Sequence, residues 1–210
     1  MDWNHLKSRT WRRIGTAVMA LWLLVVGGTE QAAAFRVVLD PGHGGRDNGT
    51  HWAGIREKDL NLDVAKRVER ILRNKGVSTY LTRRSDYYLS LTTRASRANR
   101  YRDAVYISIH FNSAPSRSAT GIETFYASTT GQRLGYQIQN RLVSRLGTKN
   151  RGLKKRGFAV LRKTRGPAVL VECGFLSNSW ERGRCKSPSY RQKVAQAIAD
   201  GIVYYRRRYS

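Results

Sequence analysis

Two histidines lie at or just after the ends of apolar runs, at positions where a folded chain could expose their imidazoles as catalytic groups or ligands. His43 follows the run 36–39 and the turn Asp40-Pro41-Gly42, a pattern that predicts a short buried strand ending in a sharp reversal. His110 ends a second run of this kind, 104–110. Because the carboxyl ends of parallel strands meet at one edge of an open α/β sheet, we expect the two imidazoles to lie close together.

Two glutamates add carboxylates to this pair of imidazoles. Glu172 ends the apolar run 168–172, where an unpaired carboxylate is costly unless a positive group meets it. Glu57 lies just before an amphipathic helical pattern that starts at Lys58. Two imidazoles and one carboxylate are a common ligand set for catalytic zinc, and a second carboxylate beside the activated water can serve as general base. The spacing of the four residues matches no compact metal-binding motif, so the fold must assemble the site.

The elements that must position these residues alternate along the chain. Short β-branched apolar runs predict strands, and apolar residues that recur every three or four positions predict helices. Strands alternating with helices indicate a single α/β domain with a mostly parallel twisted sheet of about six strands and helices on both faces. The expected strands are 36–39, 77–82, 104–110, 121–127, 158–161 and 168–172, the expected helices are 58–75, 91–102, 132–146 and 190–206, and the expected connections include a glycine-rich active-site loop at 44–54 and a basic connector at 150–156.

Length and charge narrow the class of protein. At 210 residues the chain is long enough for one well-buried domain, and its 39 Lys and Arg against 14 Asp and Glu give a formal charge of +25. Such a balance favours a polyanionic partner: nucleic acid, anionic lipid or an acidic wall polymer. The basic residues are spread along the chain, which argues against a disordered nucleic-acid-binding arm.

The first 34 residues have the pattern of a cleaved signal peptide. Basic residues precede the apolar stretch 14–26, which is short for a bilayer span, and Gln31-Ala32-Ala33-Ala34 offers a small-residue cleavage site. We therefore predict a signal peptide at 1–34, a folded domain at 35–210, no stable membrane anchor after cleavage, and a periplasmic or secreted location at the cell wall. Since 1–34 holds four basic and two acidic residues, the remaining chain carries +23. Export argues against nucleic acid as the natural partner and favours the wall.

Cys173 and Cys185 both lie in the predicted domain. An oxidising compartment permits a disulfide between them, and a pair of buried free thiols is the alternative. Their separation, without a CxxC pair, argues against a cysteine zinc site.

Four short segments resemble, in the same order, the signatures of zinc-dependent N-acetylmuramoyl-L-alanine amidases, enzymes that trim bacterial peptidoglycan. The segments are Leu39-Asp40-Pro41-Gly42-His43-Gly44-Gly45, Arg56-Glu57-Lys58, Ser108-Ile109-His110-Phe111-Asn112-Ser113 and Val171-Glu172-Cys173-Gly174-Phe175-Leu176-Ser177-Asn178. The similarity extends from about Phe35 to the C-terminus, and Thr82-Arg83 and Arg97-Ala98-Asn99 are further similar segments. One segment alone would be a weak signal, but four in order are specific.

The resemblance implies a site and a reaction. It places Zn²⁺ on His43, Glu57 and His110 and makes Glu172 the catalytic carboxylate. The substrate would be peptidoglycan, cleaved at the amide between N-acetylmuramic acid and L-alanine. Some family members carry a helical insert that blocks the zinc, but predicted elements already fill the interval between His110 and Glu172, so no activator protein is expected. The basic surface could take the place of a wall-binding module by holding anionic wall polymers.

Two other functions fit parts of the pattern. A zinc peptidase acting on the stem peptide would use the same site residues on a different bond. A non-catalytic wall- or polyanion-binding module would keep the fold and lose at least one site residue, whereas His43, Glu57, His110 and Glu172 are all present.

Overall fold

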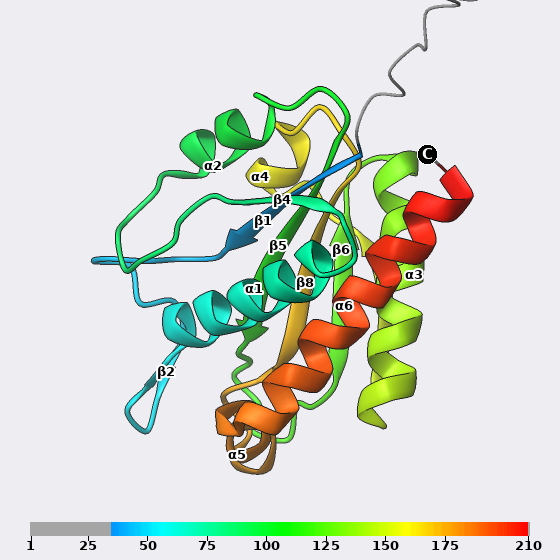
Figure 1. Ribbon diagram of the computed structural model, residues 1–210. Helices are drawn as coiled ribbons and strands as arrows, with labels where there is room; N and C mark the ends of the chain where they lie inside the picture. The colour runs from blue at the N-terminus through cyan, green and yellow to red at the C-terminus, as the bar shows by residue number, and fades with distance from the viewer. Residues whose placement is uncertain (1–34, 210) are drawn as a thin grey trace, which may run out of the picture. The chain divides into compact units, whose positions relative to one another are not determined.

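Strands and helices alternate through residues 35–209, the part of the chain that the computed structural model describes (Figure 1). The predicted signal peptide at 1–34 lies outside these residues. Among the described helices, none combines the length and apolar character needed to cross a membrane. In chain order the elements are β1 (Arg36–Pro41), β2 (His51–Trp52), β3 (Ile55–Arg56), α1 (Glu57–Arg73), β4 (Ser78–Leu81), α2 (Leu91–Ala98), β5 (Ala104–Asn112), β6 (Ile122–Tyr126), α3 (Thr129–Leu146), β7 (Asn150–Lys155), α4 (Ala159–Arg162), β8 (Ala168–Phe175), α5 (Ser179–Lys186) and α6 (Pro188–Tyr209).

Six strands form one sheet in the order β4-β1-β5-β8-β6-β7. The strands β4, β1, β5 and β8 are parallel, whereas β6 pairs antiparallel with β8 and carries β7 parallel to itself. This order places β1, β5 and β8 side by side, with their carboxyl ends at one edge of the sheet. The predicted α/β class, with a mostly parallel sheet of about six strands, is confirmed.

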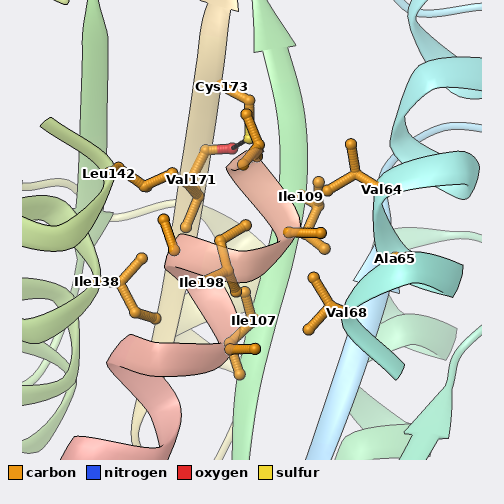
Figure 2. Close-up of a cluster of buried hydrophobic side chains, with 14 of the residues drawn as sticks. Val64, Ala65, Val68, Ile107, Ile109, Ile138, Leu142, Val171, Cys173 and Ile198 are labelled. Atoms are coloured by element: carbon orange, nitrogen blue, oxygen red, sulfur yellow. Dashed lines mark hydrogen bonds between the residues drawn. The ribbon is translucent and has the colours of Figure 1, made fainter. Parts of the chain in front are cut away.

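Helices cover the two faces of the sheet unequally (Figure 1). The long helices α1, α3 and α6 pack on one face, where Ile198 of α6 meets Val68 of α1, Ile138 of α3 and the side chains of β5 and β8 (Figure 2). The short helices α2 and α4 pack on the other face, over a smaller apolar cluster that includes Tyr106 and Leu170. Helices therefore lie on both faces, as predicted, but one face is covered far less completely.

Strand alternation decides which residues point to the thinly covered face. On β5, Val105, Ile107 and Ile109 belong to the large core under the long helices, while Tyr106 belongs to the opposite cluster. Because side chains alternate along a strand, His110 lies on the same side as Tyr106. The same count on β8 places Glu172 beside Leu170 on that face. The polar candidates thus lie where the helical cover is incomplete.

Several predicted elements differ from the structure. The run 158–161 is not a strand but lies at the start of the one-turn helix α4, and the sixth strand is β7, in the segment predicted as a connector. Four apolar residues are too few to show a helical or strand period, and β7 is an edge strand whose Lys and Arg conceal the pattern of a strand. Further differences are the hairpin β2–β3, which begins inside the predicted active-site loop and ends just beyond it, the extra helix α5, and α2, which ends at Ala98 instead of continuing to residue 102.

Cys173 and Cys185, the two cysteines of the described residues, are both buried free thiols. The structure therefore has the pair of buried thiols and not the disulfide. Cys173 and Cys185 both belong to the large core, where they pack as small apolar side chains.

Candidate metal centre and active site

Three of the four predicted site residues converge at the carboxyl edge of the sheet. His43 lies in the loop after β1, Glu57 is the first residue of α1, and His110 lies near the end of β5. One possible ligand atom from each lies within 4.8 Å of the other two. Specifically, Nε2 of His43 and Nδ1 of His110 lie 3.2 Å and 2.9 Å from Oε1 of Glu57. Such a group can hold a metal ion.

Backbone groups and imidazoles together fix the carboxylate of Glu57. The residue is only 3 % exposed. Its Oε1 accepts a hydrogen bond from the backbone N–H of Phe111 at 3.2 Å, and its Oε2 accepts one from the N–H of Thr50 at 2.9 Å. Burial alone would raise the pKa of Glu57, but hydrogen bonds and charge from His110 and His43 outweigh it and hold the pKa far below its usual range. Glu57 is therefore an anion at any physiological pH.

An acidic residue orients the first histidine. Nδ1 of His43 lies 2.8 Å from Oδ2 of Asp47, so the other ring nitrogen, Nε2, faces Glu57. Asp47 is itself held in place, because its Oδ1 accepts from the N–H of Gly49 at 3.0 Å. Burial alone would lower the pKa of His43, but hydrogen bonds and charge from Glu57 and Asp47 raise it. A carboxylate behind a ligating imidazole is the usual partner that fixes its tautomer. Sequence reasoning missed Asp47, whose weak signal is an acidic residue four positions after the histidine in a glycine-rich loop.

Two glycines let the site residues approach one another. A Cβ at Gly49, where φ is +64°, would lie 2.5 Å from Cδ2 of His43 and 2.6 Å from Oε2 of Glu57. A Cβ at Gly42 would overlap the imidazole of His110. Any side chain at either position would push a candidate ligand out of place. The backbone here is shaped around the three converging groups, which favours a bound ion over a fortuitous cluster.

Glu172 lies one strand away from this centre. In the pairing of β5 with β8 it is the register partner of His110, and in the pairing of β6 with β8 it is the partner of Glu123. Its Oε2 is buried and has no hydrogen-bond partner among residues 35–209. Burial, followed by the negative charges of Glu57 and Glu123, raises the pKa of Glu172 well above its usual value. A carboxyl group whose oxygen is buried and unpartnered is suited to proton transfer with a bound substrate.

Glu123 is a second carboxylate that sequence reasoning did not single out. It is 5 % exposed, and Nδ2 of Asn112 donates to its Oε1 at 2.6 Å. The cationic groups of Arg151 and Lys154, both from β7, contact its other oxygen. These partners compensate the charge of Glu123, whereas Glu172 beside it has no such partner. The two neighbouring carboxylates are therefore in very different environments, and only that of Glu172 leaves an oxygen unpartnered.

A buried ion pair holds the end of β1. Asp40 and Arg94 are 0 % and 3 % exposed, and Nη1 of Arg94 lies 2.9 Å from Oδ1 of Asp40. The hydroxyls of Tyr106 and Ser108 donate to Oδ2 of Asp40 at 2.6 Å and 2.9 Å. The guanidinium of Arg94 continues to the backbone oxygen of His43 at 2.7 Å. The pair therefore ties β5 and α2 to the loop that presents the first imidazole.

A second buried arginine braces the same loop from the other side. Arg83, 1 % exposed, donates to the backbone oxygens of Pro41 and Gly42, each at 3.0 Å, and of Lys58 at 2.8 Å. It therefore joins the loop before His43 to the first turn of α1, where Glu57 lies. Two candidate ligands far apart in sequence are positioned by one guanidinium.

A cavity of about 350 Å³ opens beside the converging residues. Both candidate histidines line it, and so does Arg94. Leu89 and Leu91 before and at the start of α2, together with Phe158 before α4, contribute apolar wall on the thinly covered face of the sheet. A mostly apolar cleft with a few converging polar groups is the usual form of a small-ligand or active site.

Comparison with known proteins identifies the family. The model of the N-acetylmuramoyl-L-alanine amidase family matches residues 37–204. LytC of Bacillus subtilis, an N-acetylmuramoyl-L-alanine amidase, is 40% identical over 175 residues, which are 81% of this chain but 35% of LytC, so the chain spans about a third of that relative.

Solved structures extend the likeness to the fold. The crystal structure of an N-acetylmuramoyl-L-alanine amidase from Clostridium difficile 630 is 36% identical, with a TM-score of 0.82, and the match covers 85% of this chain and all of that one. The CwlD amidase of Clostridioides difficile, solved in complex with the GerS lipoprotein, is 30% identical with a TM-score of 0.79, and the match covers 82% of this chain and 98% of that one. The predicted family is confirmed: this chain belongs to the N-acetylmuramoyl-L-alanine amidases.

Proposed function

We propose that the chain is a zinc-dependent hydrolase of peptidoglycan that cleaves the amide between the lactyl group of N-acetylmuramic acid and L-alanine. One observation carries the proposal: His43, Glu57 and His110 converge within 4.8 Å, and the unpartnered carboxyl oxygen of Glu172 lies on the adjacent strand. The bond is the one that the family is named for.

The residues fit a zinc ion better than the harder divalent cations. Two imidazoles and one carboxylate are a common ligand set of catalytic zinc, whereas calcium and magnesium prefer oxygen ligands throughout. The carboxylate of Asp47 behind His43 is the outer partner that such sites use. When bound, zinc would activate a water near neutral pH, polarise the substrate carbonyl, and favour the ionised form of Glu172 by its positive charge.

The chain's own groups account for the proton transfers. Glu172 would accept the proton of the attacking water as general base, because its Oε2 has no competing hydrogen bond. Burial, which raises the pKa of Glu172, would then help this carboxyl to keep the proton until the amine of L-alanine leaves. The apolar walls of the cavity would limit the entry of further water around the reacting amide.

The experiment is the substitution Glu172→Gln, with digestion of purified walls analysed by mass spectrometry. The amide cannot accept a proton, so we expect turnover to fall on the order of a hundredfold or more while zinc stays bound. Wild-type digests should contain free glycan strands and intact stem peptides. Shortened stem peptides would instead identify a peptidase, and a zinc-loaded Glu172→Gln protein with near-normal activity would remove Glu172 from the mechanism.

Metal dependence has its own test. His43→Ala and His110→Ala each remove one proposed ligand, so both should lower zinc content as well as rate. Retention of one equivalent of zinc in either variant would contradict the assignment. Glu57→Ala should behave in the same way, although a glutamate at the first residue of a helix also interacts favourably with the helix dipole.

Activity without a protein activator and action at the cell wall after export are further parts of the proposal. The segment between His110 and Glu172 is occupied by β6, α3, β7 and α4, which belong to the sheet or pack on it, and this supports the proposal that the site needs no activator. Purified 35–210 loaded with zinc should therefore cleave walls alone. A requirement for an added protein, such as a lipoprotein, would show that a gate exists.

A further inference from the structure

A second cavity lies at the edge of the sheet, away from the candidate metal centre. It measures about 190 Å³ and lies between the edge strand β4 and α2. Three arginines and two tyrosines contribute to its lining: Arg84, Arg97, Arg100, Tyr80 and Tyr101. We call it the arginine cavity. None of the described residues lines both this cavity and the one beside His43, and no acidic residue is among its described lining.

The positive charge of the arginine cavity is mostly uncompensated. Arg84 pairs with Glu69, but that carboxylate is shared with Arg73. Arg97 donates to the hydroxyl of Tyr87 at 3.1 Å and to a backbone oxygen, both neutral groups. Within residues 35–209, neither Arg97 nor Arg100 has an ion-pair partner, although both are at least partly exposed. The cavity therefore has the electrostatics of an anion site.

The aromatic side chains give the cavity a shape as well as a charge. The rings of Tyr80 and Tyr101 stack with centroids 4.1 Å apart and planes 20° from parallel. Because the rings cover each other's inner faces, at most one face of each is left for stacking on a base. Single-stranded nucleic acids need open aromatic faces for their bases, whereas a polyol chain can pack against edges and hydrogen-bond to hydroxyls.

We propose that the arginine cavity binds the phosphodiester of an anionic polyol polymer of the cell wall. Guanidinium groups match phosphate oxygens, and three of them around one cavity suit a tetrahedral anion better than a planar carboxylate, which one guanidinium can satisfy. Since a water molecule occupies about 30 Å³ in the liquid, the cavity has room for one phosphate with its flanking carbons, and the rest of the polymer must run along the surface.

The position of the cavity gives the binding a consequence. Helix α2 carries both Arg94, which lines the cavity beside His43, and Arg97, which lines the arginine cavity. Residues three positions apart are neighbours on the surface of a helix, about 5–6 Å between Cβ atoms, so α2 contributes to both cavities within one turn. A polymer held at the arginine cavity would keep the catalytic face close to the wall and raise the local concentration of substrate. The binding step itself requires neither the metal nor Glu172.

The test compares two double variants that remove the same charge. Arg97→Gln/Arg100→Gln alters the arginine cavity, and Arg207→Gln/Arg208→Gln removes two exposed arginines from the far end of α6 as a matched control. Fluorescence anisotropy would measure the binding of labelled poly(glycerol phosphate) to the full chain across a salt series. Polyglutamate of equal charge and single-stranded DNA serve as comparison ligands. Turnover of a soluble muropeptide is measured in parallel, so a failure of binding and a failure of the proposed catalysis are separate results.

We expect wild type to bind poly(glycerol phosphate) more tightly than polyglutamate or DNA, with inorganic phosphate as a competitor. Arg97→Gln/Arg100→Gln should weaken this binding about tenfold and flatten its salt dependence. The Arg207→Gln/Arg208→Gln control should bind poly(glycerol phosphate) less than about twofold more weakly than wild type. Equal losses in the two double variants would mean that only the overall charge matters, and tighter binding of DNA would overturn the choice of polymer. If the first double variant does not fold, Arg100→Gln alone decides. Loss of this exposed guanidinium should weaken the binding of poly(glycerol phosphate) about threefold, and unchanged binding would refute the proposal.

Discussion

Replacement of Asp40 by Asn should destabilise the fold at neutral pH without changing the shape of the side chain. Asp40 is fully buried, and Arg94, Thr82, Tyr106 and Ser108 all donate hydrogen bonds to it. An Asn has only one acceptor oxygen and adds an N–H₂ group, so the hydroxyls on that side must rotate to accept instead of donate. The larger effect is that Arg94 becomes a buried cation without a counter-charge.

The structure sets the size of the effect. Loss of one partner of a buried ion pair typically costs about 3–5 kcal/mol. Arg94 retains hydrogen bonds to the backbone oxygens of Leu89, Pro41 and His43, so its donors stay satisfied and only the charge loses its partner. We therefore expect about 3 kcal/mol, the lower end of that range. With a urea m-value of roughly 2 kcal/mol/M, the midpoint should fall by about 1.5 M.

The pH dependence gives an independent check. Burial alone would raise the pKa of Asp40, but the charge of Arg94 and the hydrogen bonds of Thr82 and Tyr106 outweigh it and hold the pKa below its ordinary value of 3.8. For a lowered folded-state pKa, the stabilisation is fully present above the unfolded-state value and is lost as the pH falls through the folded-state value. The difference in unfolding free energy between wild type and Asp40→Asn should thus be constant from about pH 7 to pH 5 and shrink below about pH 3.8.

The assay is urea unfolding followed by tryptophan fluorescence, with a chelator present so that metal binding does not contribute. The control is the double variant Asp40→Asn/Arg94→Met, which removes both buried charges and should cost less than the sum of the two single changes. A loss below about 1 kcal/mol at pH 7, or a strictly additive cycle, would refute the idea that a buried ion pair anchors the end of β1.

Three further variants test the supports of the site and the core. Asp47→Asn should lower zinc affinity about 10- to 100-fold, measured by chelator competition, since the amide is a weaker partner for Nδ1 of His43; unchanged affinity would exclude a role in orienting that ring. Gly42→Ala should lower zinc content because the new Cβ overlaps the imidazole of His110, and full zinc occupancy with normal turnover would show that the loop can shift. Ile198→Ala should cost about 2–5 kcal/mol in urea unfolding because the side chain is fully buried where α1, α3 and α6 meet, while a loss under 1 kcal/mol would mean that the core closes over the gap.

Much of the architecture follows from local patterns in the sequence. Five of the six sheet strands coincide with short apolar runs, and the helices α1, α2, α3 and α6 coincide with apolar residues that recur every three or four positions, because these elements bury their apolar side chains in the core. The same patterns place His43, His110 and Glu172 at or near the carboxyl ends of strands. Residue type then limits the chemistry, since two imidazoles with carboxylates nearby are typical of a hydrolytic zinc site.

The errors of prediction share a physical cause. The run 158–161, expected as a strand, lies mostly in helix α4, and the segment 150–156, expected as a connector, contains strand β7, because neither segment has a residue pattern that specifies its structure. β7 forms only because β6 offers it a hydrogen-bonding edge, and α4 is a single turn whose Val160 and Leu161 fill a gap over the sheet. Short elements of this kind derive their stability from tertiary packing, and local propensity is too weak to specify them.

What the fold alone decides is which polar groups meet. The order of the strands brings β1, β5 and β8 together, and the register of β5 with β8 sets Glu172 opposite His110. The orientation of His43 by Asp47 and the bracing of its loop by Arg83 and Arg94 depend on contacts between segments that the sequence does not link. Hydrogen bonds and ion pairs act over a few ångströms, so they are set by the final arrangement of backbones and leave no periodic pattern in the chain.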